Sequence, residues 1–170
     1  MDQTNIFSQG IAYTHIWCPV VAVFVSLFRS RLFGRFSIIK FADQFFAQIL
    51  FWVVGIENLI IFVMMIWFPV SASSTPIEPL LIYSYELAMV NLSFGVLGIA
   101  SPLTSIGFRT AVALGYSIWI FGDGIGHLRR ILAGLEPPPH FKSMFYTDLL
   151  IPLVILVTLM VVYQNHKSKS

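Results

Sequence analysis

Residues 51–68, "FWVVGIENLIIFVMMIWF", decide the fold class, because they form a long apolar run with a single charged side chain, Glu57. A helix that crosses the hydrocarbon core of a bilayer needs about 20 mostly apolar residues. With the residues just before it the run is long enough, so the sequence predicts a membrane-spanning helix over about 44–68.

The composition of the whole chain indicates the same class of protein. Of the 170 residues 57% are hydrophobic and 11% are charged, and the mean hydropathy is +0.82. A soluble domain carries about 25% charged residues. We therefore expect an integral membrane protein. The net charge of +2 is too small to imply nucleic-acid binding, and the single cysteine, Cys18, excludes an internal disulfide.

Five apolar segments qualify or nearly qualify as spans, and Pro- and Ser-rich stretches such as "PVSASSTPIEP" (69–79) and "EPPPH" (136–140) separate them. The sequence predicts an all-α fold: one domain, residues 1–170, forming a polytopic transmembrane helix bundle of about five spans. The predicted spans are residues 10–28, 44–68, 80–101, 107–128 and 147–164.

The basic residues predict the orientation of the bundle. With the amino terminus outside, three of the ten fall on the outer side, namely Arg129, Arg130 and Lys142. Cytoplasmic segments are enriched in Lys and Arg. We therefore expect a multi-pass protein of the cell membrane with the carboxy terminus in the cytoplasm. The residues on that side are Arg29, Arg31, Arg35, Lys40, Arg109, Lys167 and Lys169.

Several polar side chains fall at similar depths within the predicted spans. A charged side chain inside a span costs about 2.5 to 3.5 kcal/mol, so it usually faces the protein interior. At a helical rise of about 1.5 Å per residue, Glu86 lies ~9 Å and Asp123 ~8 Å below the outer ends of their spans. His127 is one turn shallower, Asp148 opens the last span, and His15 lies near the outer end of the first. We therefore expect a polar pocket in the outer half of the bilayer.

Each candidate also has a purely structural interpretation. Glu57, deep in its span, would be protonated or paired. Asn91 would hydrogen-bond across helices, and Asp148 would cap a helix amino terminus. The candidate ligand-binding residues are Glu57, Glu86, Asn91, Asp123, His127 and Asp148.

Asp123 and His127 lie in "GYSIWIFGDGIGHLRR" (115–130), four residues apart and therefore on one helix face. Three interpretations stay open: a local hydrogen bond, a proton-handling or ligand-binding pair, and metal ligation. The spacing matches no known metal motif, so we predict no metal site and leave the cofactor open.

The glycines predict how two of the spans pack. Gly122 and Gly126 form a pair of small residues four apart, and Gly95 and Gly98 lie in the preceding span. Small residues let helix backbones approach closely in lipid. We therefore expect the spans at 80–101 and 107–128 to pack tightly, which would place Glu86 close to Asp123.

The order "ELAMVNLSFGVLGIAS", "FRTAVALGYSIWIFGDGIGHL" and "DLLIPLVILVTLMV" resembles a group of small uncharacterised bacterial-type multi-span membrane proteins, over roughly residues 50–160. The group is distantly similar to the DoxX-like membrane proteins. The resemblance implies architecture rather than a reaction. DoxX-like proteins are associated with redox complexes, but this chain has no CxxC motif. The matching positions are Glu86, Asn91, Gly95, Gly122, Gly126, His127 and Asp148.

Several functions fit these features. The first is the binding of a small or lipid-like ligand in the polar pocket, or a role as a subunit. Such a subunit would assemble in the lipid with a protein partner or with copies of itself. The alternative is a membrane redox or metal-dependent enzyme subunit that uses Glu86, Asp123 and His127. A transporter that needs an oligomer and a purely structural subunit are further hypotheses. No nucleotide site or nucleophilic triad is visible, so we expect a protein other than an enzyme.

Overall fold

The computed structural model describes residues 3–32, 37–67, 77–134 and 139–167, and every secondary-structure element in these ranges is a helix. The predicted all-α fold class is therefore confirmed. A π-helical segment, η1 (Leu50–Glu57), joins α2 to α3, and a short 3₁₀ turn, η2 (Ser101–Leu103), follows α4. The α-helices are α1 (Gln3–Leu32), α2 (Ile38–Ile49), α3 (Asn58–Trp67), α4 (Ile77–Ala100), α5 (Ile106–Leu132) and α6 (Pro139–Lys167).

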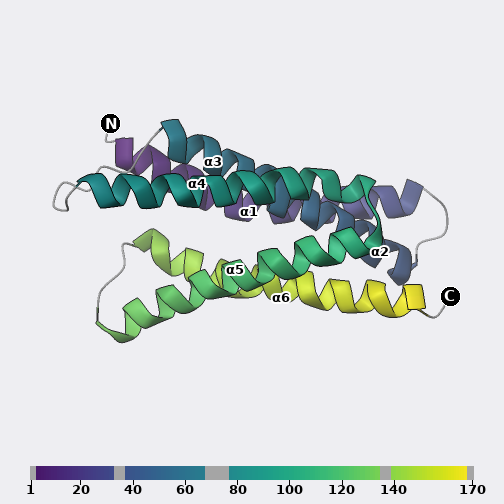
Figure 1. Ribbon diagram of the computed structural model, residues 1–170. Helices are drawn as coiled ribbons and strands as arrows, with labels where there is room; N and C mark the ends of the chain where they lie inside the picture. Colours follow the sequence, from purple (N-terminus) through teal and green to yellow (C-terminus); the bar gives the residue numbers. More distant parts are fainter. Residues whose placement is uncertain (1–2, 33–36, 68–76, 135–138, 168–170) are drawn as a thin grey trace.

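The helices run back and forth along one elongated bundle, with the two chain ends at opposite ends of it (Figure 1). In this arrangement α4 packs along η1 and α3, and α5 packs along α6. Helix α1 contacts α2, η1 and α6, which brings the first part of the chain against the last. Residues far apart in the sequence therefore meet inside the bundle.

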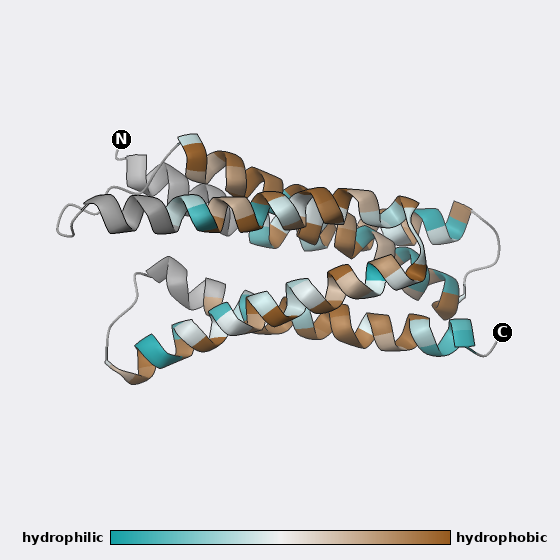
Figure 2. Cartoon of the chain, viewed as in Figure 1, coloured by the Kyte–Doolittle hydropathy of each residue, from teal (hydrophilic) through white to brown (hydrophobic). Residues whose placement is uncertain are grey.

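Four stretches of the described residues are long and apolar enough to cross a membrane. Helix α5 coincides with the predicted span at 107–128 and is 27 residues long, but it is not among these four. Its glycines and charged side chains lower its hydropathy, and Figure 2 shows α5 paler than α3 over much of its length. The four stretches are Thr14–Leu32, Ile38–Trp67, Ser84–Leu103 and Phe145–Lys167.

Large apolar side chains on the outside of the bundle fit a lipid environment. Phe24, Ile118 and Met160 are 68%, 73% and 63% exposed. Exposed large apolar side chains on several helices are what contact with lipid or a partner requires. The interior is sealed by fully buried side chains of α2, η1 and α6, including Phe46 and Ile155. The surface and the core together support the class of integral membrane proteins.

The closest helix approach joins α4 to η1 through glycines. A methyl group on Gly98 would overlap the backbone of Gly55, and one on Gly95 would lie 2.6 Å from the Leu59 side chain. Only glycine fits at such a crossing, since any side chain would force the backbones apart. The glycines of α4 therefore pack against η1 and α3, the second apolar segment of the chain.

The expected role of Gly122 and Gly126 in packing 107–128 against 80–101 is wrong. Gly122 and Gly126 face open space, with nothing within 4 Å of an added methyl group. Gly124, between them, is the residue that packs: a methyl group there would lie 3.2 Å from Leu149 and 3.4 Å from Asp148. The physical reason is that α5 turns the face with Gly124 toward α6, and a shift of two residues along the helix places Gly122 and Gly126 on another face.

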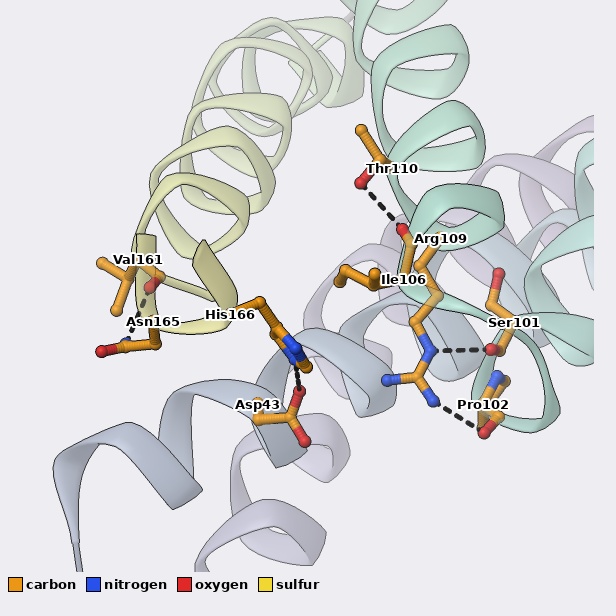
Figure 3. A network of polar contacts seen from close by, with 9 residues as sticks. All are labelled: Asp43, Ser101, Pro102, Ile106, Arg109, Thr110, Val161, Asn165 and His166. Carbon is orange, nitrogen blue, oxygen red and sulfur yellow. Dashed lines mark hydrogen bonds and ion pairs between the residues drawn. The ribbon is translucent and has the colours of Figure 1, made fainter. Parts of the chain in front are cut away.

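The turn between α4 and α5 is held by an arginine (Figure 3). Arg109 Nε donates to the Ser101 carbonyl at 2.9 Å, and its Nη2 donates to the Pro102 carbonyl at 2.8 Å. Carbonyls at the end of a helix lack partners within it, and a cation there also suits the helix dipole. Arg109 is thus a first-turn residue of α5 that binds the carbonyls of the 3₁₀ turn at the end of α4. Arg35 and Lys169, used to predict the orientation, lie outside the described residues.

Candidate functional site

Ionisable side chains from four helical elements meet inside the bundle. His15 comes from α1, Glu57 from η1, Asp123 and His127 from α5, and Asp148 from α6. His15 lies close enough to Glu57, Asp148 and Asp123 to interact electrostatically with each of them. We call these five residues the polar cluster. It contains three carboxyl groups and two imidazoles.

Glu57 and His15 form the innermost part of the polar cluster. Glu57 is 1% exposed, and its Oε1 contacts His15 Nδ1. Within the described part of the chain neither carboxyl oxygen of Glu57 has a hydrogen bond of good geometry. A buried carboxylate is costly unless it is paired, so the imidazole of His15 is the group that compensates Glu57. Glu57 therefore lies paired in the bundle, one of the two possibilities open from the sequence.

The π-helical segment η1 ends at Glu57 and is followed by a second buried polar residue. This residue, Asn58, is 2% exposed. Asn58 Nδ2 donates to the carbonyls of Val53 and Val54 at 3.1 and 3.0 Å, five and four residues earlier. A side-chain hydrogen bond also joins Asn58 to Tyr116 of α5. π-Helical turns are rare and are often found at functional sites.

The outer part of the polar cluster is a group of three residues where α5 meets α6. His127 Nε2 lies 3.5 Å from Asp148 Oδ2 and 4.0 Å from Asp123 Oδ2. The Asp148 side chain is 9% exposed and that of Asp123 is 57% exposed. One atom of each residue can be chosen so that all three lie within 4.8 Å of one another. The group is therefore compact, with one open side at Asp123.

The local sequence explains why Asp148 reaches this position. Gly124, one turn before His127, lets the α5 backbone approach Asp148 and Leu149. Pro152 follows Asp148 by one turn, and it has no N–H to bond the Asp148 carbonyl. Asp148 is an interior residue of α6, which begins at Pro139, so the helix-cap interpretation does not apply.

The remaining two candidates lie away from the polar cluster on α4. Glu86 is exposed on α4, and the compact group of Asp123, His127 and Asp148 among the described residues does not include it. Asn91 is buried at 3% exposure, where its Nδ2 donates to the Leu87 carbonyl at 2.8 Å and lies 3.8 Å from the Met65 sulfur. Asn91 thus links α4 to α3. Helix α4 packs chiefly on η1 and α3 and meets α5 through Phe94, which stacks on Trp119, so the packing gives the expected approach of Glu86 to Asp123 no support.

Two residues of this interior were not among the candidates drawn from the sequence. His15 was expected in the polar layer, as a residue type suited to metal ligation, but its partnership with Glu57 joins residues 42 positions apart, which no local pattern reveals. Tyr116 is 4% exposed in an apolar helix, where an aromatic residue carries no functional signal of its own. Asn58 directly follows Glu57. Two adjacent polar residues inside an apolar segment were the sequence signal for a buried polar site there.

Comparison with known proteins places the chain in a family but assigns no reaction. No curated protein and no solved structure matches it. The comparisons do not show the distant similarity to DoxX-like proteins, whereas they support the resemblance to an uncharacterised family. Residues 11–169, nearly the whole chain, match one family, and the chain belongs to it: the family of unknown function DUF6790.

Proposed function

We propose that this integral membrane protein binds a small positively charged ligand at the polar cluster. One observation carries the proposal: Asp148 is buried in the bundle, and among the described residues its Oδ2 has no hydrogen-bond donor. Ionisable residues inside a membrane bundle mark substrate and ion pathways. A bound cation would compensate this carboxylate.

The charge balance of the polar cluster favours a cation over an anion or a neutral lipid. Three carboxyl groups face two imidazoles, and the ion pairs of the described residues bring imidazoles, not Lys or Arg, to these carboxyl groups. The cluster therefore holds an excess of acidic groups. The Asp123 side chain is 57% exposed, so the group of Asp123, His127 and Asp148 has a polar residue on its outer side.

Thermal unfolding in mild detergent tests the proposal. The purified protein is heated with Na⁺, Mg²⁺, Mn²⁺, Zn²⁺, choline or spermidine, and the intrinsic tryptophan fluorescence is followed. A ligand at 100 times its Kd stabilises the folded state by about 2.7 kcal/mol. We expect at least one cation to raise the Tm by several degrees in the wild type and to have no effect on Asp148→Asn.

Asp43→Asn is the matched control, because Asp43 is an exposed acid on α2, outside the polar cluster. It should keep the full cation response. The proposal fails if no cation raises the Tm of the wild type, or if Asp148→Asn responds as the wild type does.

The proposal includes a cell-membrane location with the amino terminus outside and the carboxy terminus in the cytoplasm. Its support is the distribution of Lys and Arg residues, because α1 ends with Arg29 and Arg31 and α6 ends with Lys167. A carboxy-terminal green fluorescent protein fusion should fluoresce, and an alkaline phosphatase fusion at the same point should be inactive. The reverse pattern would overturn the orientation.

A further inference from the structure

We propose that Asp123, His127 and Asp148 bind one divalent transition-metal ion. The inference rests on the proposed function and specifies it, since the metal ion would be the small cation. The three residues come from α5 and α6, and the ion would therefore join these two helices at their crossing.

The spacing of the three side chains suits metal ligands better than direct hydrogen bonds. An N–H···O hydrogen bond spans about 2.7 to 3.2 Å, whereas His127 Nε2 lies 3.5 Å from Asp148 Oδ2. Two ligand atoms that each lie about 2.1 Å from a tetrahedral zinc ion are separated by roughly 3.4 Å. The observed separation matches that value. Asp123 Oδ2, at 4.0 Å from the same nitrogen, belongs to a side chain that is more than half exposed and can rotate inward.

Asp148 provides a second and independent indication of a ligand. Its side chain is more than nine-tenths buried, and it points toward His127 of the neighbouring helix. Its Oδ2 has no hydrogen-bond donor among the described residues. Leaving a buried acceptor unsatisfied costs about 1 to 3 kcal/mol, and more when the group is charged. A metal ion between Asp148 and His127 would supply the missing partner.

The ligand types select the class of metal ion. One imidazole nitrogen and two carboxylate oxygens suit Zn²⁺, Mn²⁺ or Fe²⁺, whereas Ca²⁺ prefers oxygen ligands alone and Cu⁺ prefers sulfur. The two carboxylates also neutralise the charge of a divalent ion, because an uncompensated charge is costly in apolar surroundings. Three protein ligands leave a coordination position for water or another ligand on the exposed side at Asp123.

Metal binding by the purified full-length protein is the test. The protein in mild detergent is stripped with EDTA, incubated with ZnCl₂ or MnCl₂ and desalted, and the bound metal is measured by inductively coupled plasma mass spectrometry. Titration with CoCl₂ adds an absorption spectrum that reports on the ligand geometry. We expect one metal ion per chain, with affinity at least tenfold lower in His127→Ala and in Asp148→Asn.

The chain contains a matched control for these variants. His166 at the carboxy-terminal end of α6 lies 3.9 Å from Asp43 of α2, and both side chains are partly exposed (Figure 3). The two are residue types that also occur in the proposed site. Asp43→Asn and His166→Ala should bind zinc as the wild type does. If they lose zinc instead, or if His127→Ala keeps it, the metal is bound elsewhere and the inference is wrong.

Asp123→Asn keeps the test decisive if a buried variant fails to fold. Because Asp123 is exposed, its replacement should leave the helical circular dichroism unchanged while zinc affinity falls; unchanged zinc affinity in this folded variant overturns the three-residue site. Binding of choline or Na⁺ that depends on Asp148, without stoichiometric binding of any metal, would overturn the metal site and leave the proposed function standing. The absence of any cation binding would overturn both.

Discussion

Gly98 of α4 lies so close to Gly55 of η1 that a single methyl group on Gly98 would overlap the Gly55 backbone. This contact fixes α4 against the segment that ends at Glu57. We predict that Gly98→Ala lowers the free energy of unfolding by about 1 to 3 kcal/mol, as overpacking does. Gly122→Ala is the control, because nothing lies within 4 Å of a methyl group there. Chemical denaturation in detergent would measure both, and equal stability of the two variants would contradict the prediction.

The pairing of Glu57 with His15 predicts an asymmetry between single and double variants. His15→Leu leaves a buried carboxylate without its partner, and breaking a buried pair in this way costs about 3 to 5 kcal/mol. Replacement of both members by apolar residues, as in His15→Leu with Glu57→Met, should recover most of that loss. A double-mutant cycle on the free energy of unfolding checks this. Additive losses would show that the two side chains do not compensate each other.

Gly124 predicts a link between helix packing and the geometry of the polar cluster. A methyl group on Gly124 would lie 3.2 Å from the end of the Leu149 side chain and 3.4 Å from Asp148 Cβ, so these side chains would have to shift. We therefore expect Gly124→Ala to weaken the binding of any cation at His127 and Asp148 by about tenfold, as changes to the groups that orient metal ligands do. Gly126→Ala, which faces open space, should bind normally. Isothermal titration with the cation that gives the largest Tm shift compares them, and equal affinities would refute the link.

Arg109 predicts a local contribution to stability outside the polar cluster. Arg109→Ala removes two charge-assisted hydrogen bonds to the carbonyls of Ser101 and Pro102. We expect a loss of about 1 to 3 kcal/mol in the free energy of unfolding and no change in cation affinity. Arg129→Ala, an exposed residue near the end of α5, should change the free energy of unfolding by less than about 0.5 kcal/mol. A cation affinity that falls in Arg109→Ala would show that the α4–α5 turn and the polar cluster are coupled.

Apolar run length was enough to predict the helical class, because the cost of burying backbone polar groups in lipid leaves the helix as the only structure for such segments. It also located Asp123, His127 and Asp148, since their depth depends only on counting residues along helices. The structure brings these three together; ligand binding by them stays a prediction.

Helix rotation could not be predicted in the same way. Whether Gly122, Gly124 or Gly126 meets a neighbour depends on which face of α5 turns inward, and a shift of two residues rotates that face by about 200°. The same applies to Glu86, which shares the predicted depth but lies exposed on α4. The partnership of Glu57 and His15 depends in addition on the π-helical turn before Asn58, for which the sequence carries no periodic signal.

The low hydropathy of α5 has a consequence for how the protein is made. A helix with these glycines and charged side chains does not partition into lipid by itself as readily as α3 or α6 does. Because α5 packs chiefly along α6, we expect it to enter the bilayer as a hairpin with α6, after both have left the ribosome. Membrane insertion of residues 106–132 would then depend on sequence that is translated later, and we expect a chain truncated before residue 145 to leave α5 outside the bilayer.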